Sequence, residues 1–223
     1  MYKTNESFSL SRGFNITYED VLQAVQATNN SLRALPQNVF QNIDFKTTSA
    51  IIGSFFCAEL AGICDGAMVN PIEKGHPDII PIEGANASEA ELRNYHSGLE
   101  IKCTIGNVKT GANLRATETR IKELASIVWQ AHHRDVAELM GIVWDFYCPE
   151  GGFNYPMITA VFYSDDLNEE DWGAISGTTG RNTKVSGMKS SGKFKMGEGW
   201  VVLFDNPTFE DTYKKILKFN PIS

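Results

Sequence analysis

The chain has 223 residues, of which 42% are hydrophobic and 21% are charged, as in an ordinary globular protein with a core of normal size. Its 20 Lys and Arg residues stand against 27 Asp and Glu, for a net charge of −7, which argues against a protein that binds polyanions nonspecifically. No apolar run approaches the ~20 residues that cross a bilayer, and the start of the chain lacks the apolar segment of a signal peptide. We therefore expect an intracellular, cytoplasmic protein with no membrane partner.

Two helices are predicted in the first third of the chain. The first covers 17–35, with Thr17 as a possible N-cap, and the second covers 46–64. Residues 37–45 between them are expected to form a linker or a short turn. Apolar residues recur at near-helical spacing in both segments: Val21, Leu22, Val25 and Leu32 in the first, and Ile52, Phe55, Phe56 and Ile63 in the second.

The middle of the chain is predicted to hold two short strands. After a loop over 65–77, residues 78–83 form the first strand, residues 84–98 a turn with a possible helical piece, and residues 99–106 the second strand. Alternation puts two sets of side chains on opposite faces of the second strand: Leu99, Ile101, Cys103 and Ile105 on one, and Glu100, Lys102 and Thr104 on the other.

The last part of the chain alternates between strands and helices. The predicted elements are a helix over 116–133, strands over 139–148 and 155–164 joined by a turn, a strand over 199–205 and a helix over 208–219. Helices followed by strands, with a helix among them, predict an α/β (α+β) protein with a central mixed sheet flanked by helices. We expect residues 1–223 to form a single domain.

The cysteines and histidines give no metal signature. None of the four cysteines belongs to a C-x-x-C pair and each lies in an apolar stretch, so buried free thiols are expected at Cys57, Cys64, Cys103 and Cys148. His132 and His133 are adjacent, and adjacent residues rarely bind one zinc ion from one helix face.

Three polar residues of the two middle strands form a candidate active site. If the strands are neighbours, Asp78 lies near Glu100 with Lys102 beside them. Two carboxylates can hold Mg²⁺, which lowers the pKa of a bound water and stabilises charge on a phosphate. Lys102 can orient or deprotonate that water, or neutralise the charge. The alternatives are a surface ion pair between Glu100 and Lys102, and a turn role for Asp78.

Pro77-Asp78 and Glu100-Ile101-Lys102 resemble the PD-(D/E)xK motif of a nuclease superfamily that includes many type II restriction endonucleases. The resemblance covers about residues 48–140, with a helix before the first acidic residue and another after the E-x-K strand. It implies a restriction-endonuclease-like core of prokaryotic type, with Mg²⁺, or Mn²⁺ as a substitute, held by Asp78, Glu100 and Ile101. It also implies that residues 150–223 are specific to this enzyme and supply DNA recognition and further sheet elements.

Glu59 is a further candidate, because it shares the apolar stripe of the second helix with Ile52, Phe55 and Ile63. A buried ionised carboxylate is costly unless it is paired or lies near a metal. Members of the resembled family often place a Glu from this helix at the edge of the metal site, which implies a catalytic role for Glu59. The alternative is a residue at a wet boundary. Glu83 ranks lower because its place on the strand favours the opposite face.

Two basic stretches are candidates for DNA contact. Residues 177–197 contain no acidic residue and are expected to form a loop or ribbon that contacts phosphates, with Arg181 or Asn182 reading a base edge. The basic residues of the two stretches are Arg181, Lys184, Lys189, Lys193 and Lys195 in the first, and Lys109, Arg115, Arg120 and Lys122 in the second. The alternatives are a solvated loop for the first stretch and ordinary helix-surface pairing for the second.

These observations predict a Mg²⁺-dependent endodeoxyribonuclease that hydrolyses double-stranded DNA at a specific short sequence. A homodimer is expected, because palindromic sites mirror two-fold protein symmetry. Two alternatives stay open: a repair or junction-resolving nuclease of the same fold, and a non-catalytic DNA-binding module.

Overall fold

The computed structural model describes residues 1–73, 75–106, 127–131, 136–175 and 185–219. They form a mixed α/β structure around a five-stranded sheet with the order β1-β11-β9-β8-β6. The strands are β1 (Tyr2–Thr4), β6 (Ile101–Ile105), β8 (Leu139–Phe146), β9 (Pro156–Ser164) and β11 (Trp200–Phe204). Strands β6 and β8 run parallel and every other neighbouring pair is antiparallel, so the sheet is mixed, as predicted.

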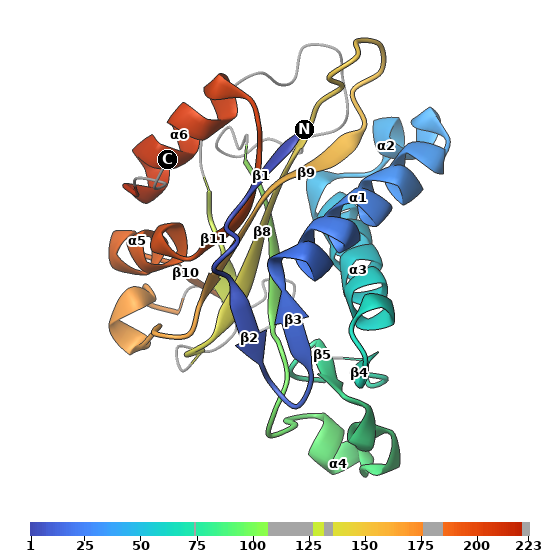
Figure 1. Cartoon of the computed structure of the whole chain (residues 1–223), viewed down its shortest axis with the longest axis vertical. Coiled ribbons are helices and arrows are strands. Elements are labelled where there is room, and N and C mark those ends of the chain that lie inside the picture. The colour runs from blue at the N-terminus through green and yellow to red at the C-terminus, as the bar shows by residue number, and fades with distance from the viewer. Residues whose placement is uncertain (74, 107–126, 132–135, 176–184, 220–223) are drawn as a thin grey trace.

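Helices cover both faces of this sheet (Figure 1). One face carries α1 (Tyr18–Ala34), α2 (Gln37–Asn42) and α3 (Phe45–Ile63), and the other carries α5 (Ser190–Glu198) and α6 (Pro207–Leu217). Strand β8 is buried on both sides: Met140 and Ile142 pack into the α1–α3 layer, whereas Leu139 and Val143 pack into the α5–α6 layer. A strand buried on both faces has a near-continuous apolar sequence, as β8 has.

Local signals explain why the first two long helices begin where they do. The Thr17 side chain accepts a hydrogen bond from the Asp20 amide while the Asp20 carboxylate accepts one from the Thr17 amide at 2.7 Å, which forms a capping box for α1. Asp44 caps α3 by accepting from the Thr47 amide at 2.8 Å. The helix predictions over 17–35, 46–64 and 208–219 are confirmed, as are the strands over 139–148, 155–164 and 199–205.

Several short elements were not predicted. Helix α2 replaces part of the expected linker over 37–45, and β4 (Ala67–Val69) lies within the expected loop over 65–77. Strand β4 pairs with β5 (Ile79–Pro81), which confirms the strand predicted over 78–83. A 3₁₀ helix over Ile82–Asn86 was not predicted, whereas α4 (Glu89–Leu92) is the helical piece expected as a possibility within 84–98. Strand β1 and the hairpin of β2 (Ser9–Ser11) with β3 (Asn15–Thr17) were also missed. Elements of three residues are too short for periodicity to reveal.

The predicted helix over 116–133 is wrong where the structure describes it, and residues 107–126 and 132–135 lie outside the described part. Here β7 (Gln130–Ala131) pairs with β10 (Ser186–Gly187). The buried Trp129 packs so closely on Gly141 of β8 that a Cβ at Gly141 would lie 2.5 Å from the indole ring. The Trp129 carbonyl accepts a hydrogen bond from Met188 at 3.0 Å, so pairing with the 186–188 segment takes the place of helical bonding.

The basic stretch 177–197 is not the expected loop over its second half. Residues 176–184 lie outside the described part, but Ser190–Glu198 form α5 on the face of the sheet away from α3. Met196 of this helix is fully buried in the apolar layer between the sheet and helices α5 and α6. Tertiary packing of one buried side chain therefore overrides the Gly- and Ser-rich composition that suggested a loop.

All four cysteines are free, and Cys57 and Cys64 are buried as expected, whereas Cys103 and Cys148 are half-buried. Among the described residues, no helix combines the length and apolarity needed to cross a membrane.

Candidate active site

The start of β5 is joined to the residues just before β6, so the condition under which Asp78 and Glu100 come together is met. Ile79 and Leu99 exchange two main-chain hydrogen bonds of 3.1 and 2.8 Å. Gly98 makes this approach possible: its φ is +143°, and a Cβ there would lie 2.2 Å from the Ile79 carbonyl oxygen. The bridge places Asp78, one residue before Ile79, beside Glu100, one residue after Leu99.

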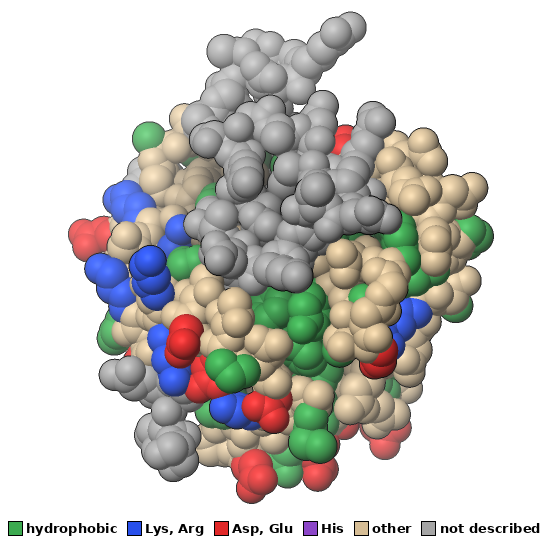
Figure 2. Space-filling view, turned by 90° about the horizontal axis from the view of Figure 1, so that it is seen from above, with side chains coloured by type: hydrophobic (Ala, Val, Ile, Leu, Met, Phe, Trp, Pro, Cys, Tyr) green, Lys and Arg blue, Asp and Glu red, His purple; other side chains and the backbone are tan. Residues whose placement is uncertain are grey.

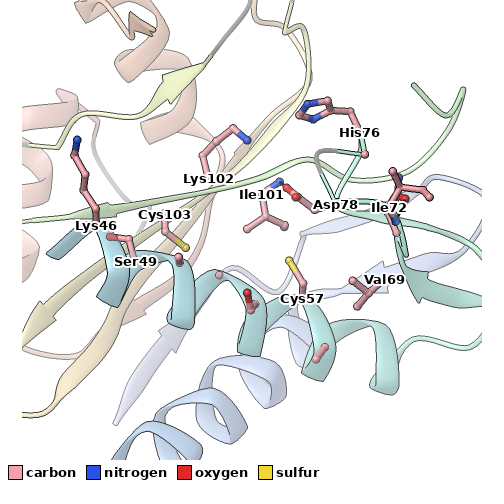
Figure 3. Close-up of a pocket in the computed structure, with 16 residues that line it drawn as sticks. Lys46, Ser49, Cys57, Val69, Ile72, His76, Asp78, Ile101, Lys102 and Cys103 are labelled. Carbon is pink, nitrogen blue, oxygen red and sulfur yellow. Dashed lines mark hydrogen bonds between the residues drawn. The ribbon is translucent and has the colours of Figure 1, made fainter. Parts of the chain in front are cut away.

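Asp78 is fixed against the open edge of the sheet. Among the described residues, β6 is the last strand of the sheet, and the Glu100 carbonyl already bonds Met140 of β8 at 2.9 Å. In a parallel ladder the next residue, Ile101, directs its main-chain groups away from β8. The Ile101 amide donates to Asp78 Oδ2 at 2.8 Å, so the carboxylate lies where a further strand would pair (Figure 3).

Glu100 and Lys102 lie on the same face of β6, as alternation predicted, and they form an ion pair between Glu100 Oε1 and Lys102 Nζ. The side chains are 12% and 24% exposed respectively, so this is not a solvated surface pair. The second oxygen of Glu100, Oε2, lies 3.3 Å from His76 Nδ1. His76 was not predicted as a site residue. The available signal was its place directly before Pro77-Asp78.

Asp78, Glu100 and Lys102 form a cluster whose electrostatics favour the binding of a cation. Burial and the neighbouring Glu100 carboxylate raise the pKa of Asp78 to about 6, even though Lys102 and the Ile101 amide act in the opposite direction. Burial alone would lower the pKa of Lys102, but the Glu100 and Asp78 carboxylates outweigh it and raise that pKa above its ordinary value. Lys102 therefore remains an ammonium group at neutral pH and only partly balances two carboxylates.

The donor set fits a hard cation such as Mg²⁺. Asp78, Glu100 and the edge-facing carbonyl of Ile101 offer oxygen atoms alone, which are the ligands that Mg²⁺ prefers. In the part of the chain that the structure describes, no three His, Cys, Asp or Glu side chains gather as a metal-binding group. A cation held here would complete its coordination with water or substrate oxygens, as Mg²⁺ commonly does.

The cluster lies between two cavities. One cavity, of about 660 Å³, lies between α3 and β6 (Figure 3). It is lined by Asp78, Ile101 and Lys102, and by small residues of α3 that include Gly53 and Cys57. The other, of about 460 Å³, is lined by Tyr95, Glu100 and Val136 among others. His76 and Lys102 line both cavities. The polar groups are thus reachable by a substrate from outside.

The structure does not bring Glu59 to this cluster. Helix α3 turns Gly53 and Cys57 toward the cavity, and Glu59 follows Cys57 by two residues, which is about 200° around a helix. Its side chain is half-buried on the other side of α3, which agrees with the boundary alternative. Glu83 is exposed in the 3₁₀ helix that follows β5.

Most of the predicted DNA contacts lie outside the described residues: Lys109, Arg115, Arg120, Lys122, Arg181, Asn182 and Lys184. Lys189 is exposed at the N-cap of α5, and burial lowers the pKa of Lys193. Lys195 has structural partners, because its amino group bonds Asp171 Oδ2 at 2.9 Å and the main-chain carbonyl of Asp166.

On the face shown in Figure 2, the described Lys and Arg side chains lie mostly along one margin, among Asp and Glu side chains. The pairing of Lys3 and Lys214 with Glu210, at 2.5 and 2.8 Å, is of this mixed kind. Charges interleaved in this way form local ion pairs rather than a continuous basic surface.

Comparison with known proteins finds no matching family model, no matching curated protein and no matching solved structure.

Proposed function

We propose that this protein is a Mg²⁺-dependent endodeoxyribonuclease with a restriction-endonuclease-like core that cuts double-stranded DNA at a specific short sequence as a homodimer. The observation that carries the proposal is the convergence of Asp78, Glu100 and Lys102 at the open edge of β6, between two cavities. Two partly buried carboxylates with one ammonium group suit phosphodiester hydrolysis, which requires a cation and stabilisation of developing negative charge.

Each group of the cluster has a separate role in the proposed reaction. Asp78, Glu100 and the Ile101 carbonyl would hold Mg²⁺, which when bound supplies charge neutralisation and a water of lowered pKa. The Ile101 amide keeps the Asp78 carboxylate in place. Without a metal, the Glu100 and Asp78 carboxylates raise the pKa of Lys102 and favour its ammonium form, which is suited to stabilise negative charge on a phosphate.

Cleavage of a supercoiled plasmid tests the proposal directly. The wild-type protein should cut in Mg²⁺ or Mn²⁺ and not in EDTA. Discrete fragments would support a restriction enzyme, whereas a smear or selective cutting of branched DNA would favour the repair or junction-resolving alternative. DNA binding in Ca²⁺ with no cutting in any divalent metal would leave only the non-catalytic module.

The proposed dimer has its own test. One cluster of Asp78, Glu100 and Lys102 cuts one strand, so a duplex cut in a single event requires two chains. Size-exclusion chromatography with light scattering should give twice the mass of the 24.7 kDa chain for the protein alone, or that mass plus the mass of the DNA for the complex. A monomer under both conditions would contradict the dimer but not the chemistry.

A further inference from the structure

We propose that His76 is a positioning residue that holds the Glu100 carboxylate in the orientation required for the metal, an inference that rests on the proposed nuclease function. The carboxylate has a donor at each oxygen: Lys102 at Oε1 and His76 Nδ1 at Oε2, the latter at 3.3 Å. An ionised carboxylate only accepts hydrogen bonds, so the imidazole nitrogen is the donor. Two donors on opposite oxygens prevent the carboxylate from rotating, and each oxygen keeps a lone pair for a cation.

The main chain of His76 is itself held at both of its polar groups. Its amide donates to the Arg93 carbonyl at 3.3 Å, and its carbonyl accepts from the Tyr95 amide at 2.7 Å. These bonds fasten the segment before Asp78 to the segment that follows α4. The donor to Glu100 therefore comes from a main chain fixed on its own account, as positioning requires.

The place of the imidazole also fits this role. It lies between the two cavities, and Figure 3 shows it on the same side of β6 as the Lys102 amino group. The His76 side chain is 35% exposed and that of Glu100 is 12% exposed, so the imidazole contacts a carboxylate that is largely shielded from solvent. Loss of the imidazole would both free Glu100 to rotate and admit water to it.

The test compares three substitutions of His76 with a matched control. His76→Ala removes the donor, His76→Phe fills the ring volume without a donor, and His76→Asn keeps a side-chain N–H near the position of Nδ1. His96→Ala is the control, because His96 is an exposed histidine whose ring stacks on Tyr95 with centroids 4.5 Å apart. The readouts are Mn²⁺ affinity by isothermal titration calorimetry without DNA, plasmid cleavage, and thermal unfolding as a check of folding.

Removal of the donor should weaken Mn²⁺ binding and cleavage by about 10- to 100-fold each, as loss of a group that orients a metal ligand does. His76→Asn should recover most of both, and His96→Ala should match the wild type. Unchanged Mn²⁺ affinity in His76→Ala or His76→Phe, or an Asn variant no better than these, overturns the role of His76 and leaves the nuclease proposal standing. A wild-type protein that neither binds Mn²⁺ nor cuts DNA overturns both. The Phe variant decides the outcome if the Ala variant does not fold.

Discussion

Two lysine–carboxylate pairs of this molecule, Glu100–Lys102 and Asp171–Lys195, differ in what surrounds them. Asp171 is almost completely buried, yet its pKa is lowered, because hydrogen bonds from Lys195, Ser191 and the Asn168 amide outweigh the effect of burial. Near Lys102 the balance is reversed: a second carboxylate, Asp78, shares the space and its pKa is raised. One pair is fully satisfied, while the other cluster has an excess of negative charge.

The comparison indicates what separates a structural ion pair from a candidate active site. Lys195 links α5 to the short 3₁₀ helix Glu169–Asp171, and the Asn168 amide donates to the same oxygen of Asp171. The Glu100–Lys102 pair faces two cavities and has a charge imbalance that only a cation or protons can correct. Lysine pairing alone therefore says little about function, whereas an additional carboxylate beside an accessible cavity says more.

The largest effect is expected at the Asp78 cluster. Asp78→Asn, Glu100→Gln and Lys102→Ala should each reduce plasmid cleavage by about 10³-fold or more, because loss of a metal ligand or a charge-stabilising group raises the barrier by several kcal/mol. DNA binding measured by gel shift in Ca²⁺ should persist in Lys102→Ala. The exposed residues Glu83→Gln and Lys215→Ala serve as matched controls and should cut as the wild type does. Near-wild-type cleavage by Asp78→Asn would refute the proposed site.

The second pair should respond in stability instead. Asp171→Ala removes the acceptor for Lys195 and for the Asn168 amide at 3.0 Å. Unfolding in urea should show a loss of about 1–3 kcal/mol, because the buried Asp171 carboxylate accepts charge-assisted hydrogen bonds that the variant cannot make. Cleavage per folded molecule should remain within about two-fold. A large loss of cleavage with unchanged stability would mean that Asp171 belongs to the functional surface.

The two carboxylates should also give opposite dependences of stability on pH. Asp78 has a folded-state pKa of about 6, above the unfolded value of about 3.9, so the folded state binds the proton more tightly. Its contribution favours folding at low pH and is lost as pH rises through the folded pKa. The lowered pKa of Asp171 acts in the other direction: its contribution is present above the unfolded pKa and lost as pH falls.

Asp78→Asn should therefore stabilise the metal-free protein at pH 7, by about 1–2 kcal/mol once the partial exposure of the carboxyl is discounted. Chemical denaturation in EDTA at pH 4.5 and pH 7 measures this, and the gain should be smaller at the lower pH. Mg²⁺ should raise the melting temperature of the wild type more than that of Asp78→Asn. An equal effect of Mg²⁺ on the two proteins would argue against a metal at Asp78.

The parts of this structure that were predictable are those encoded by local signals. The Thr17 cap and regular apolar spacing predict α1, apolar spacing predicts α3, and alternation places Glu100 and Lys102 on one face of β6. The Ile79–Leu99 bridge needed only the assumption that the two middle strands are neighbours.

What could not be predicted depends on tertiary contact. Helix α5 forms because Met196 is buried against the sheet, against the preference of its Gly- and Ser-rich sequence. The three-residue strands are too short to show a period. His76 meets Glu100 across 24 residues, and its place before Pro77-Asp78 suggests proximity but not this contact.

The smallest predicted effect on cleavage is that of a substitution at Glu59, where the sequence and the structure lead to different expectations. The apolar stripe with Ile52 and Phe55 indicated a buried carboxylate and the family resemblance implied a catalytic role, yet α3 turns Cys57 and not Glu59 toward the cavity beside Asp78. Glu59→Gln keeps the shape and removes the charge from a half-buried position. Because nothing places this charge near the reacting groups, plasmid cleavage in Mg²⁺ should stay within about two-fold of the wild type, and stability within about 0.5 kcal/mol. A loss of cleavage above ten-fold with unchanged unfolding would mean that Glu59 reaches the metal after DNA binds, and α3 would then have to rotate toward β6 in the complex.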